Sequence, residues 1–226
     1  MQRICVAVAR EMVDEALTVA EQAASQADVI EIRLDYLRQI QVAPFCAAIK
    51  KPLLFTNRPT WEGGQFAGEE DARLAPLLEA VAQEAAYIDL ELMSPATSLH
   101  RLQKEIEQAS TRLILSWHNF QRTPERPELV AKLKAMQENG AHIGKIVTMA
   151  FTFRDVLRVL QLQEDAARMH FPLIAFCMGG AGVISRLATL ELGGYMTYCS
   201  AGEGGATAPG QLPVAALREM LERMRN

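Results

Sequence analysis

The chain has 226 residues, of which 50% are hydrophobic and 22% are charged, and its formal net charge is −4. This composition is typical of a globular protein with one large core, and the acidic balance argues against a general nucleic-acid binder, which would normally show a basic face. No apolar stretch approaches the roughly 20 residues that span a bilayer, and the first residues lack the long apolar segment of a signal peptide.

Short apolar runs alternate with segments of helical periodicity along the whole chain. The predicted strands are residues 4–9, 29–34, 52–56, 87–92, 112–117, 143–149, 172–177 and 195–199. The predicted helices are residues 12–26, 43–49, 69–85, 94 onward, 127–138, 152–169, 182–192 and 213–225. Such alternation indicates parallel strands with right-handed crossovers, and eight units favour a (β/α)8 TIM barrel, with residues 1–226 as a single domain. A doubly wound open sheet is the alternative, but the GxGxxG that usually follows its first strand is missing here.

Two of the predicted helices begin with recognisable capping signals. Ser94 precedes Pro95, as an N-cap residue precedes a proline at the first helical position. Thr152 stands at the start of the helix predicted for residues 152–169. We expect both hydroxyl groups to accept from free backbone N–H groups of the first turn.

Polar side chains occupy interior positions of several predicted strands. Alternate residues of a barrel strand face the interior and the helical shell. In residues 29–34 the apolar side chains alternate along the strand and are expected to face the helices, so Glu31 and Arg33 face the barrel interior. These two residues could have a functional role, or they could form a buried ion pair at the barrel floor. Arg58 and His118 lie at the carboxyl ends of their strands, where the active sites of this fold are found.

A lysine stands inside the apolar run of residues 143–149. Buried lysine is rare unless it is paired, so one interpretation is that the strand begins at Ile146 and the Lys145 amine reaches solvent. The other follows from parity, because Lys145 shares a face with Val147 and would enter the barrel toward His118 on the adjacent strand. The interior arginines and His118 favour the second interpretation.

This set of side chains suits carbonyl chemistry. An uncharged lysine amine attacks a carbonyl to form a Schiff base, which makes a proton on the adjacent carbon easier to remove. A neutral histidine beside it can take that proton and return it, and a glutamate can fix the orientation of the imidazole. Arginines hold a carboxylate substrate by bidentate hydrogen bonds.

Metal and phosphate motifs are missing from the sequence. No two His or Cys residues have metal-ligand spacing, and there is no P-loop, although the glycines of residues 202–205 could serve a phosphate weakly. The four cysteines lie far apart without a CxxC pair. We therefore expect no metal and reduced thiols in a cytoplasmic protein.

An ordered set of motifs extends over essentially the whole chain and resembles one family. The motifs are residues 31–35 (Glu-Ile-Arg-Leu-Asp), Arg58 with 62–64 (Glu-Gly-Gly), 88–91 (Ile-Asp-Leu-Glu), 116–120 (Ser-Trp-His-Asn-Phe), 145–147 (Lys-Ile-Val), 182–186 (Gly-Val-Ile-Ser-Arg) and 208–211 (Ala-Pro-Gly-Gln). The chain resembles the type I 3-dehydroquinate dehydratases, the Schiff-base enzymes of the shikimate pathway. That resemblance implies conversion of 3-dehydroquinate to 3-dehydroshikimate and water by a homodimer, with no added cofactor.

The resemblance also implies roles for individual residues. Lys145 would form the imine, His118 would transfer protons and Glu62 would orient His118. The implied substrate-binding residues are Glu31, Arg33, Arg58, Phe120, Met178, Arg186, Thr207 and Gln211. Residues 201–211 would close as a lid.

Three features depart from the family pattern. Thr207 stands where serine is expected, Phe176 stands where many members have methionine, and the chain begins at the first strand without a segment to cover the barrel floor. Two alternative functions stay open on the sequence: a Schiff-base aldolase acting on a sugar phosphate, and a non-catalytic barrel that binds a small carboxylate.

Overall fold

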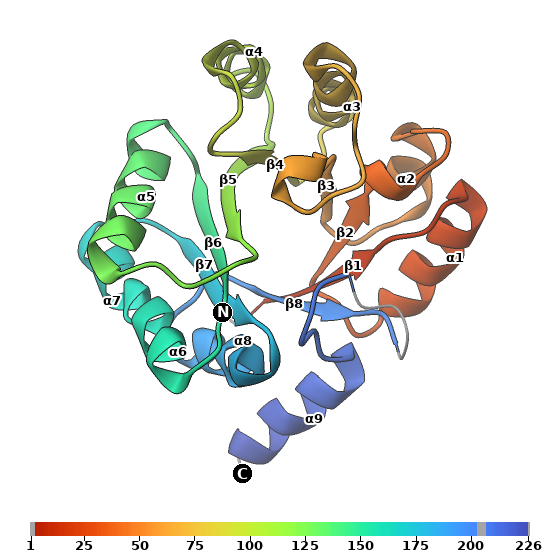
Figure 1. The fold of residues 1–226 in the computed structure, drawn as a ribbon. Coiled ribbons are helices and arrows are strands. Elements are labelled where there is room, and N and C mark those ends of the chain that lie inside the picture. Colours follow the sequence, from red (N-terminus) through yellow and green to blue (C-terminus); the bar gives the residue numbers. More distant parts are fainter. Residues whose placement is uncertain (1–2, 203–206, 226) are drawn as a thin grey trace.

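Parallel strands form the centre of the computed structural model, which describes residues 3–202 and 207–225 (Figure 1). In this part of the chain the strands are β1 Ile4–Val8, β2 Val29–Arg33, β3 Leu53–Thr56, β4 Tyr87–Glu91, β5 Arg112–Asn119, β6 Ile143–Met149, β7 Leu173–Met178 and β8 Thr197–Ser200. They pair in the order β7-β6-β5-β4-β3-β2-β1-β8, every ladder being parallel. Because β8 returns to β1, the sheet curls into a barrel, so the predicted (β/α)8 fold is confirmed and the open sheet is wrong.

One seam of the barrel is held differently from the rest. No ladder joins β7 and β8, both of which the structure describes in full. Instead, the Tyr195 amide donates to the Leu173 carbonyl at 2.8 Å, and the Gly179 amide donates to the Pro209 carbonyl at 3.4 Å. The seam is therefore closed by isolated backbone bonds, and it lies beside the chain that leads from β8 to the last helix.

Helices surround the strands on the outside of the barrel (Figure 1). The described helices are α1 Val13–Ala23, α2 Ala43–Ala48, α3 Glu70–Ala82, α4 Ala96–Ile106, α5 Arg126–Glu138, α6 Phe153–Leu160, α7 Leu162–Arg168, α8 Val183–Glu191 and α9 Val214–Arg225, with short 3-10 turns η1 Leu34–Tyr36, η2 Thr60–Glu62 and η3 Gly180–Gly182. The single helix predicted for residues 152–169 is two helices, α6 and α7, with Gln161 between them. None of the described helices is long and apolar enough to cross a membrane.

The two predicted helix caps have different outcomes. Thr152 caps α6 as predicted, in a capping box with Asp155. The prediction for Ser94 is wrong, because the N-cap of α4 is Pro95 and it makes no side-chain cap bond. The Ser94 hydroxyl instead accepts from the guanidinium of Arg73 at 2.9 Å. The Ser94 hydroxyl therefore binds a buried arginine of the neighbouring helix α3 and not the free N–H groups at the start of α4.

The core has two layers that follow from strand alternation. Ile30 and Ile32 face the helices in the outer layer, whereas Val29, Leu54 and Ile174 belong to a cluster inside the barrel. This interior cluster leaves the inward positions near the carboxyl ends of the strands to polar side chains. The site is thus built on a packed apolar base rather than on a pore.

An aromatic cluster closes the amino-terminal end of the barrel. The hydroxyl groups of Tyr87 and Tyr195 are 2.9 Å apart, and Arg112 donates to Tyr195 at 2.7 Å. The guanidinium carbon of Arg3 lies 4.4 Å from the centre of the Tyr195 ring. Tyr87 is buried, so these side chains cover the barrel floor.

Candidate active site

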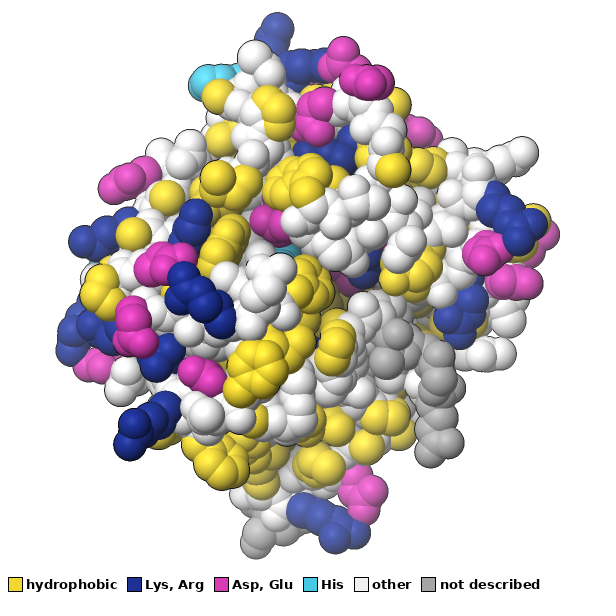
Figure 2. Space-filling view, viewed as in Figure 1, with side chains coloured by type: hydrophobic (Ala, Val, Ile, Leu, Met, Phe, Trp, Pro, Cys, Tyr) yellow, Lys and Arg dark blue, Asp and Glu magenta, His cyan; other side chains and the backbone are white. Residues whose placement is uncertain are grey.

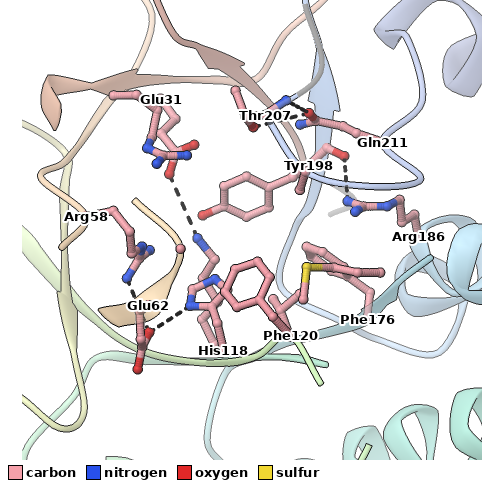
Figure 3. A pocket seen from close by; sticks show the side chains of 16 residues that line it. Glu31, Arg58, Glu62, His118, Phe120, Phe176, Arg186, Tyr198, Thr207 and Gln211 are labelled. Carbon is pink, nitrogen blue, oxygen red and sulfur yellow. Dashed lines mark hydrogen bonds and ion pairs between the residues drawn. The ribbon is translucent and has the colours of Figure 1, made fainter. Parts of the chain in front are cut away.

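Every side chain that was assigned to the site lines one pocket at the carboxyl ends of the strands (Figure 3). The assigned residues around it are Glu31, Arg33, Arg58, Glu62, His118, Phe120, Lys145, Met178, Arg186, Thr207 and Gln211. The same pocket is also lined by Gly63, Val147, Phe176, Tyr198 and Ala208, which were not assigned. The structure therefore brings all of the assigned residues together in one pocket.

Lys145 projects from the middle of β6 into the barrel. Its residue is 4% exposed, so the interpretation with the amine in solvent is wrong. The amine donates to Asp89 Oδ2 at 3.0 Å and lies 3.8 Å from Glu31 Oε1. It also lies 4.1 Å from the centre of the Tyr198 ring. Two carboxylates therefore flank this amine, a feature that strand parity alone did not reveal.

His118 lies on β5, the strand next to Lys145, and its ring is almost fully enclosed. It pairs in register with Val147, and Ser116 pairs with Lys145. The imidazole stacks on Phe120 with ring centres 6.1 Å apart. Burial lowers the pKa of His118 well below its ordinary value, and the positive charges of Arg58 and Lys145 lower it further. The ring is therefore neutral near pH 7 and able to accept a proton.

Glu62 ends the turn η2 and faces His118. Its Oε2 lies 2.9 Å from His118 Nδ1 and 3.8 Å from the guanidinium of Arg58. Burial raises the pKa of Glu62 to about 8; Arg58 opposes this rise, and the nearby carboxylates of Glu91 and Asp89 add to it. When Glu62 is ionised, Nδ1–H donates to it and Nε2 is left as the proton acceptor. The charge of Glu62 therefore decides which imidazole nitrogen can act as a base.

A glycine beside Glu62 allows the histidine ring its stacking partner. Gly63 has a φ of 75°, in the left-handed region. A Cβ atom at this position would lie 2.3 Å from Cζ of Phe120. Only glycine lets the turn and the Phe120 ring occupy these positions together.

Arg58 is the centre of a buried charged network beneath the pocket. It donates to Glu91 Oε1 and to the Ser116 hydroxyl, each at 2.6 Å, and it pairs with Asp89 at 2.9 Å. Ser116 in turn donates to Asp89 at 2.6 Å. Burial opposes ionisation of Asp89, but Arg58, the Lys145 ammonium and the Ser116 bond together hold its pKa below the ordinary range. Asp89 is therefore a carboxylate that positions charges and not a proton carrier.

The network continues outward through Arg73, a fully buried arginine of α3. Arg73 Nη1 donates to the second oxygen of Glu91, and its Nε and Nη2 donate to Glu70, each at 2.8 Å. A chain of alternating charge thus runs from Lys145 through Asp89, Arg58, Glu91 and Arg73 to Glu70. Each buried charge in it has an opposite neighbour, which is the condition for keeping such charges in an interior.

Arg33 does not make the ion pair with Glu31 that was the structural alternative for these residues. Its guanidinium binds both oxygens of Asp35, at 2.9 and 2.8 Å. Glu31 instead accepts from the Thr56 hydroxyl at 2.8 Å. This arrangement leaves Glu31 next to Lys145.

Arg186 differs from the other pocket arginines because no carboxylate accompanies it in the described part of the chain. Its Nη1 and Nη2 donate to the carbonyls of Tyr198 and Pro209 at 3.4 and 3.3 Å. Its Nε is buried and has no partner among the described residues, and its guanidinium carbon lies 4.6 Å from the centre of the Phe176 ring. Burial lowers its pKa to about 10, so it stays charged near neutral pH. A buried cation of this kind is suited to bind an anionic ligand.

Comparison with known proteins identifies the family. The model for type I 3-dehydroquinase matches residues 4–226. The chain belongs to the type I 3-dehydroquinase family. It is 46% identical over 222 residues to the 3-dehydroquinate dehydratase of Desulfotalea psychrophila, covering 98% of each chain, and 36% identical to that of Methanopyrus kandleri, covering 94% and 93%. The solved 3-dehydroquinate dehydratase of Geobacillus kaustophilus superposes with a TM-score of 0.90 at 30% identity, covering 99% and 91%.

Membership of the dehydratase family fixes the reaction class. The protein is a hydro-lyase that dehydrates 3-dehydroquinate, a step that fits the shikimate pathway. The alternatives of a sugar-phosphate aldolase and of a non-catalytic binder are set aside. Within residues 3–202 and 207–225, no group of His, Cys, Asp and Glu side chains is placed to hold a metal ion.

Part of the expected lid lies in the described chain. Thr207 donates from its amide and its hydroxyl to Oε1 of Gln211, at 2.7 and 3.2 Å. Both residues face the pocket (Figure 3). Residues 203–206 of the segment that was predicted as a lid lie outside the described residues.

Sequence reasoning assigned no role to Asp89, Glu91, Arg73 or Tyr198. The sequence does indicate that Asp89 and Glu91 face the barrel interior, because they are two residues apart and therefore share one face of the strand predicted for residues 87–92. Arg73 carried none, since a helix residue reveals its burial only in the packed fold. Tyr198 lies on the inward face of β8, where an aromatic residue by itself indicates only core packing.

Proposed function

We propose that the enzyme works through a Schiff base on Lys145, with His118 as the proton-transferring residue. The observation that carries this proposal is a lysine amine buried in the barrel, with the imidazole of His118 on the adjacent strand. Burial also lowers the pKa of His118, which favours the uncharged ring. The amine and the substrate ketone form an imine, and His118 takes a proton from the adjacent ring carbon. The resulting enamine expels the neighbouring hydroxyl group, which takes that proton and leaves as water. Hydrolysis of the imine then releases 3-dehydroshikimate.

The carboxylates around Lys145 suit the charged intermediate. A protonated imine carries the same positive charge as the lysine ammonium. Asp89 and Glu31 lie 3.0 and 3.8 Å from Nζ. Their negative charges therefore still face a positive charge when the lysine nitrogen becomes an iminium. Because these groups are in place before reaction, the charge requires little reorganisation of the site.

The remaining pocket residues suit a ring that bears hydroxyl groups and a carboxylate. Arg186 has no acidic partner in the described chain, so we propose that it binds the substrate carboxylate with help from Gln211 and Thr207. Glu31, Arg33 and Arg58, whose charges are already balanced, would orient the ring hydroxyls. The apolar side chains that would pack against the ring are Phe120 and Met178.

Reduction with borohydride tests the imine. When the protein is mixed with 3-dehydroquinate and borohydride, we expect an adduct in the intact mass that peptide mapping places on Lys145. Lys145→Ala should form no adduct and show no turnover, whereas His118→Ala should still form the adduct but dehydrate slowly. An unmodified wild-type mass, or full activity in His118→Ala, would contradict the assignment.

We also propose that two copies associate through an apolar surface. Phe151, Phe153, Leu157, Ile184 and Met220 are all exposed, and several of them line one shallow groove with Leu187 and Leu212. Figure 2 shows hydrophobic side chains gathered over α6, α8 and α9. Patches of this kind are uncommon on monomers. Sedimentation should give a dimer for the wild type and a monomer for Phe153→Asp; a wild-type monomer would contradict this.

We propose further that residues 1–226 act as one catalytic domain in the cytoplasm. The four cysteines are all free thiols, three of them buried, which suits a reducing compartment. Lysine supplies the covalent chemistry of the proposed steps, so none of them calls for a cofactor. Full activity of the purified chain after dialysis against a chelator would support this, and restoration by an added metal would contradict it.

A further inference from the structure

The hydroxyl of Tyr198, a residue that lines the pocket, is buried without a hydrogen-bond partner in the described part of the chain. Few buried side-chain atoms of the described residues lack one: Asn57 Oδ1, Thr111 Oγ1, Arg186 Nε, Thr197 Oγ1 and Tyr198 Oη. Two of these residues, Arg186 and Tyr198, line the pocket. A buried polar group with no partner costs about 1–3 kcal/mol, and a phenylalanine would fill the same space without that cost. Both unpaired atoms are therefore best explained by a ligand.

The position of the ring limits which part of the ligand the hydroxyl can meet. Tyr198 lies on β8 and faces the barrel interior, where it pairs in register with Cys5. The Lys145 amine lies over its ring, 4.1 Å from the centre. Figure 3 shows the ring reaching across the pocket with its hydroxyl directed to the side of Glu31 and Arg58. The substrate carbon that bonds to Lys145 would therefore lie on the side of the pocket that the Tyr198 ring covers.

The hydroxyl is a donor and not an acid. Burial raises the pKa of Tyr198 well above its ordinary value, and the negative charge of Glu31 raises it further. The phenol thus keeps its proton throughout the working pH range. Glu31 Oε1 is already bonded to the Thr56 hydroxyl, and the Tyr198 O–H bonds to no acceptor among the residues that the structure describes.

We propose that Tyr198 donates a hydrogen bond to the ketone oxygen of the substrate while Lys145 adds to the carbonyl carbon. The nitrogen–carbon bond forms, the carbonyl electron pair moves to the oxygen, and the negative charge developing there is stabilised by the O–H group. The Lys145 ammonium first passes one proton to the neighbouring carboxylate of Glu31, 3.8 Å away, and the uncharged amine then adds to the ketone. That proton and a second one from the lysine nitrogen end on the departing oxygen. The products are the protonated imine and water, and Tyr198 loses no proton. This inference rests on the Schiff base proposed above and adds a residue to its first step.

Tyr198→Phe tests the inference because it removes the oxygen alone. We expect the rate of imine formation to fall about tenfold, which is the effect of one hydrogen bond in the transition state. This rate is measured by rapid mixing with substrate, quenching with borohydride and intact-mass analysis. Substrate deuterated at the carbon that loses its proton should show a smaller isotope effect on kcat/KM, because imine formation becomes more limiting. The thermal midpoint should stay equal or rise, since the protein loses an unpaired buried group.

Tyr87→Phe is the matched control. This hydroxyl lies at the barrel floor, bonded to Tyr195 at 2.9 Å, and its loss should lower the thermal midpoint without changing imine formation. An unchanged rate of imine formation in Tyr198→Phe, with normal trapping of the wild type, would overturn the role of Tyr198 alone. Absence of trapping in the wild type would instead overturn the Schiff base.

Discussion

Glu91 offers a sharp test of the buried charge network. It is 1% exposed and accepts from Arg58 at 2.6 Å on one oxygen and from Arg73 on the other. In Glu91→Gln the shape is nearly unchanged, but the amide N–H2 group must face one of two guanidinium donors. Removal of one partner from a buried ion pair typically costs about 3–5 kcal/mol, against a total stability of about 5–15 kcal/mol for a folded protein. We therefore expect this conservative change to remove a large share of the free energy of unfolding.

The assay is urea unfolding followed by far-ultraviolet circular dichroism and by fluorescence of Trp61 and Trp117. Coincident transitions of the two probes are needed before a free energy is taken from the curve. Asp71→Asn is the matched control, because it breaks a pair with Arg101 in which the two side chains are 88% and 53% exposed, and such pairs contribute about 0–1 kcal/mol. If Glu91→Gln lowered the free energy of unfolding as little as Asp71→Asn does, the buried carboxylate would not stabilise Arg58 and Arg73 in the folded protein.

Four further predictions concern the pocket. Arg186→Met should lower kcat/KM for 3-dehydroquinate about 10- to 100-fold, mainly through KM, because a hydrogen bond to a charged group contributes about 1.5–3 kcal/mol; an unchanged KM in steady-state assays would contradict carboxylate binding there. Since the pKa of Glu62 is raised to about 8, kcat/KM should rise with pH through a step near this value, and Glu62→Gln should remove the step. The same raised pKa stabilises the folded state below the ordinary pKa of glutamate, a contribution lost as the pH rises through about 8, which pH-dependent melting should show. Gly63→Ala should destabilise the protein by about 1–2 kcal/mol through its positive φ and reduce kcat by displacing Phe120, which thermal melting and steady-state assays should show.

Strand parity predicted much of the pocket. Alternation alone directed Glu31, Arg58, His118 and Lys145 into the barrel, because the outward positions must be apolar to seat the helices. The same rule applied to residues 87–92 would also have found Asp89 and Glu91. Alternation gives direction, however, and not partners, and it therefore could not show two carboxylates beside the Lys145 amine.

Other parts of the site depend on contacts between distant segments. Arg33 pairs with Asp35 because the turn η1 folds that carboxylate back onto the end of β2, a geometry that residue spacing does not specify. Ser94 has the sequence context of a cap, yet it bonds to Arg73 of the neighbouring helix. Thr207 and Gln211 entered the prediction only through the family resemblance, because a loop has no periodicity from which to infer direction.

Arg186 also bonds across the seam between β7 and β8. Its side chain begins on α8, which follows β7, and donates to carbonyls of Tyr198 and Pro209 on the far side of that seam. The residue proposed to bind the substrate therefore also bridges β7 and β8, two fully described strands that no ladder joins. A bound carboxylate would compete with these two carbonyls for the same guanidinium, so binding of the substrate should loosen the seam between β7 and β8.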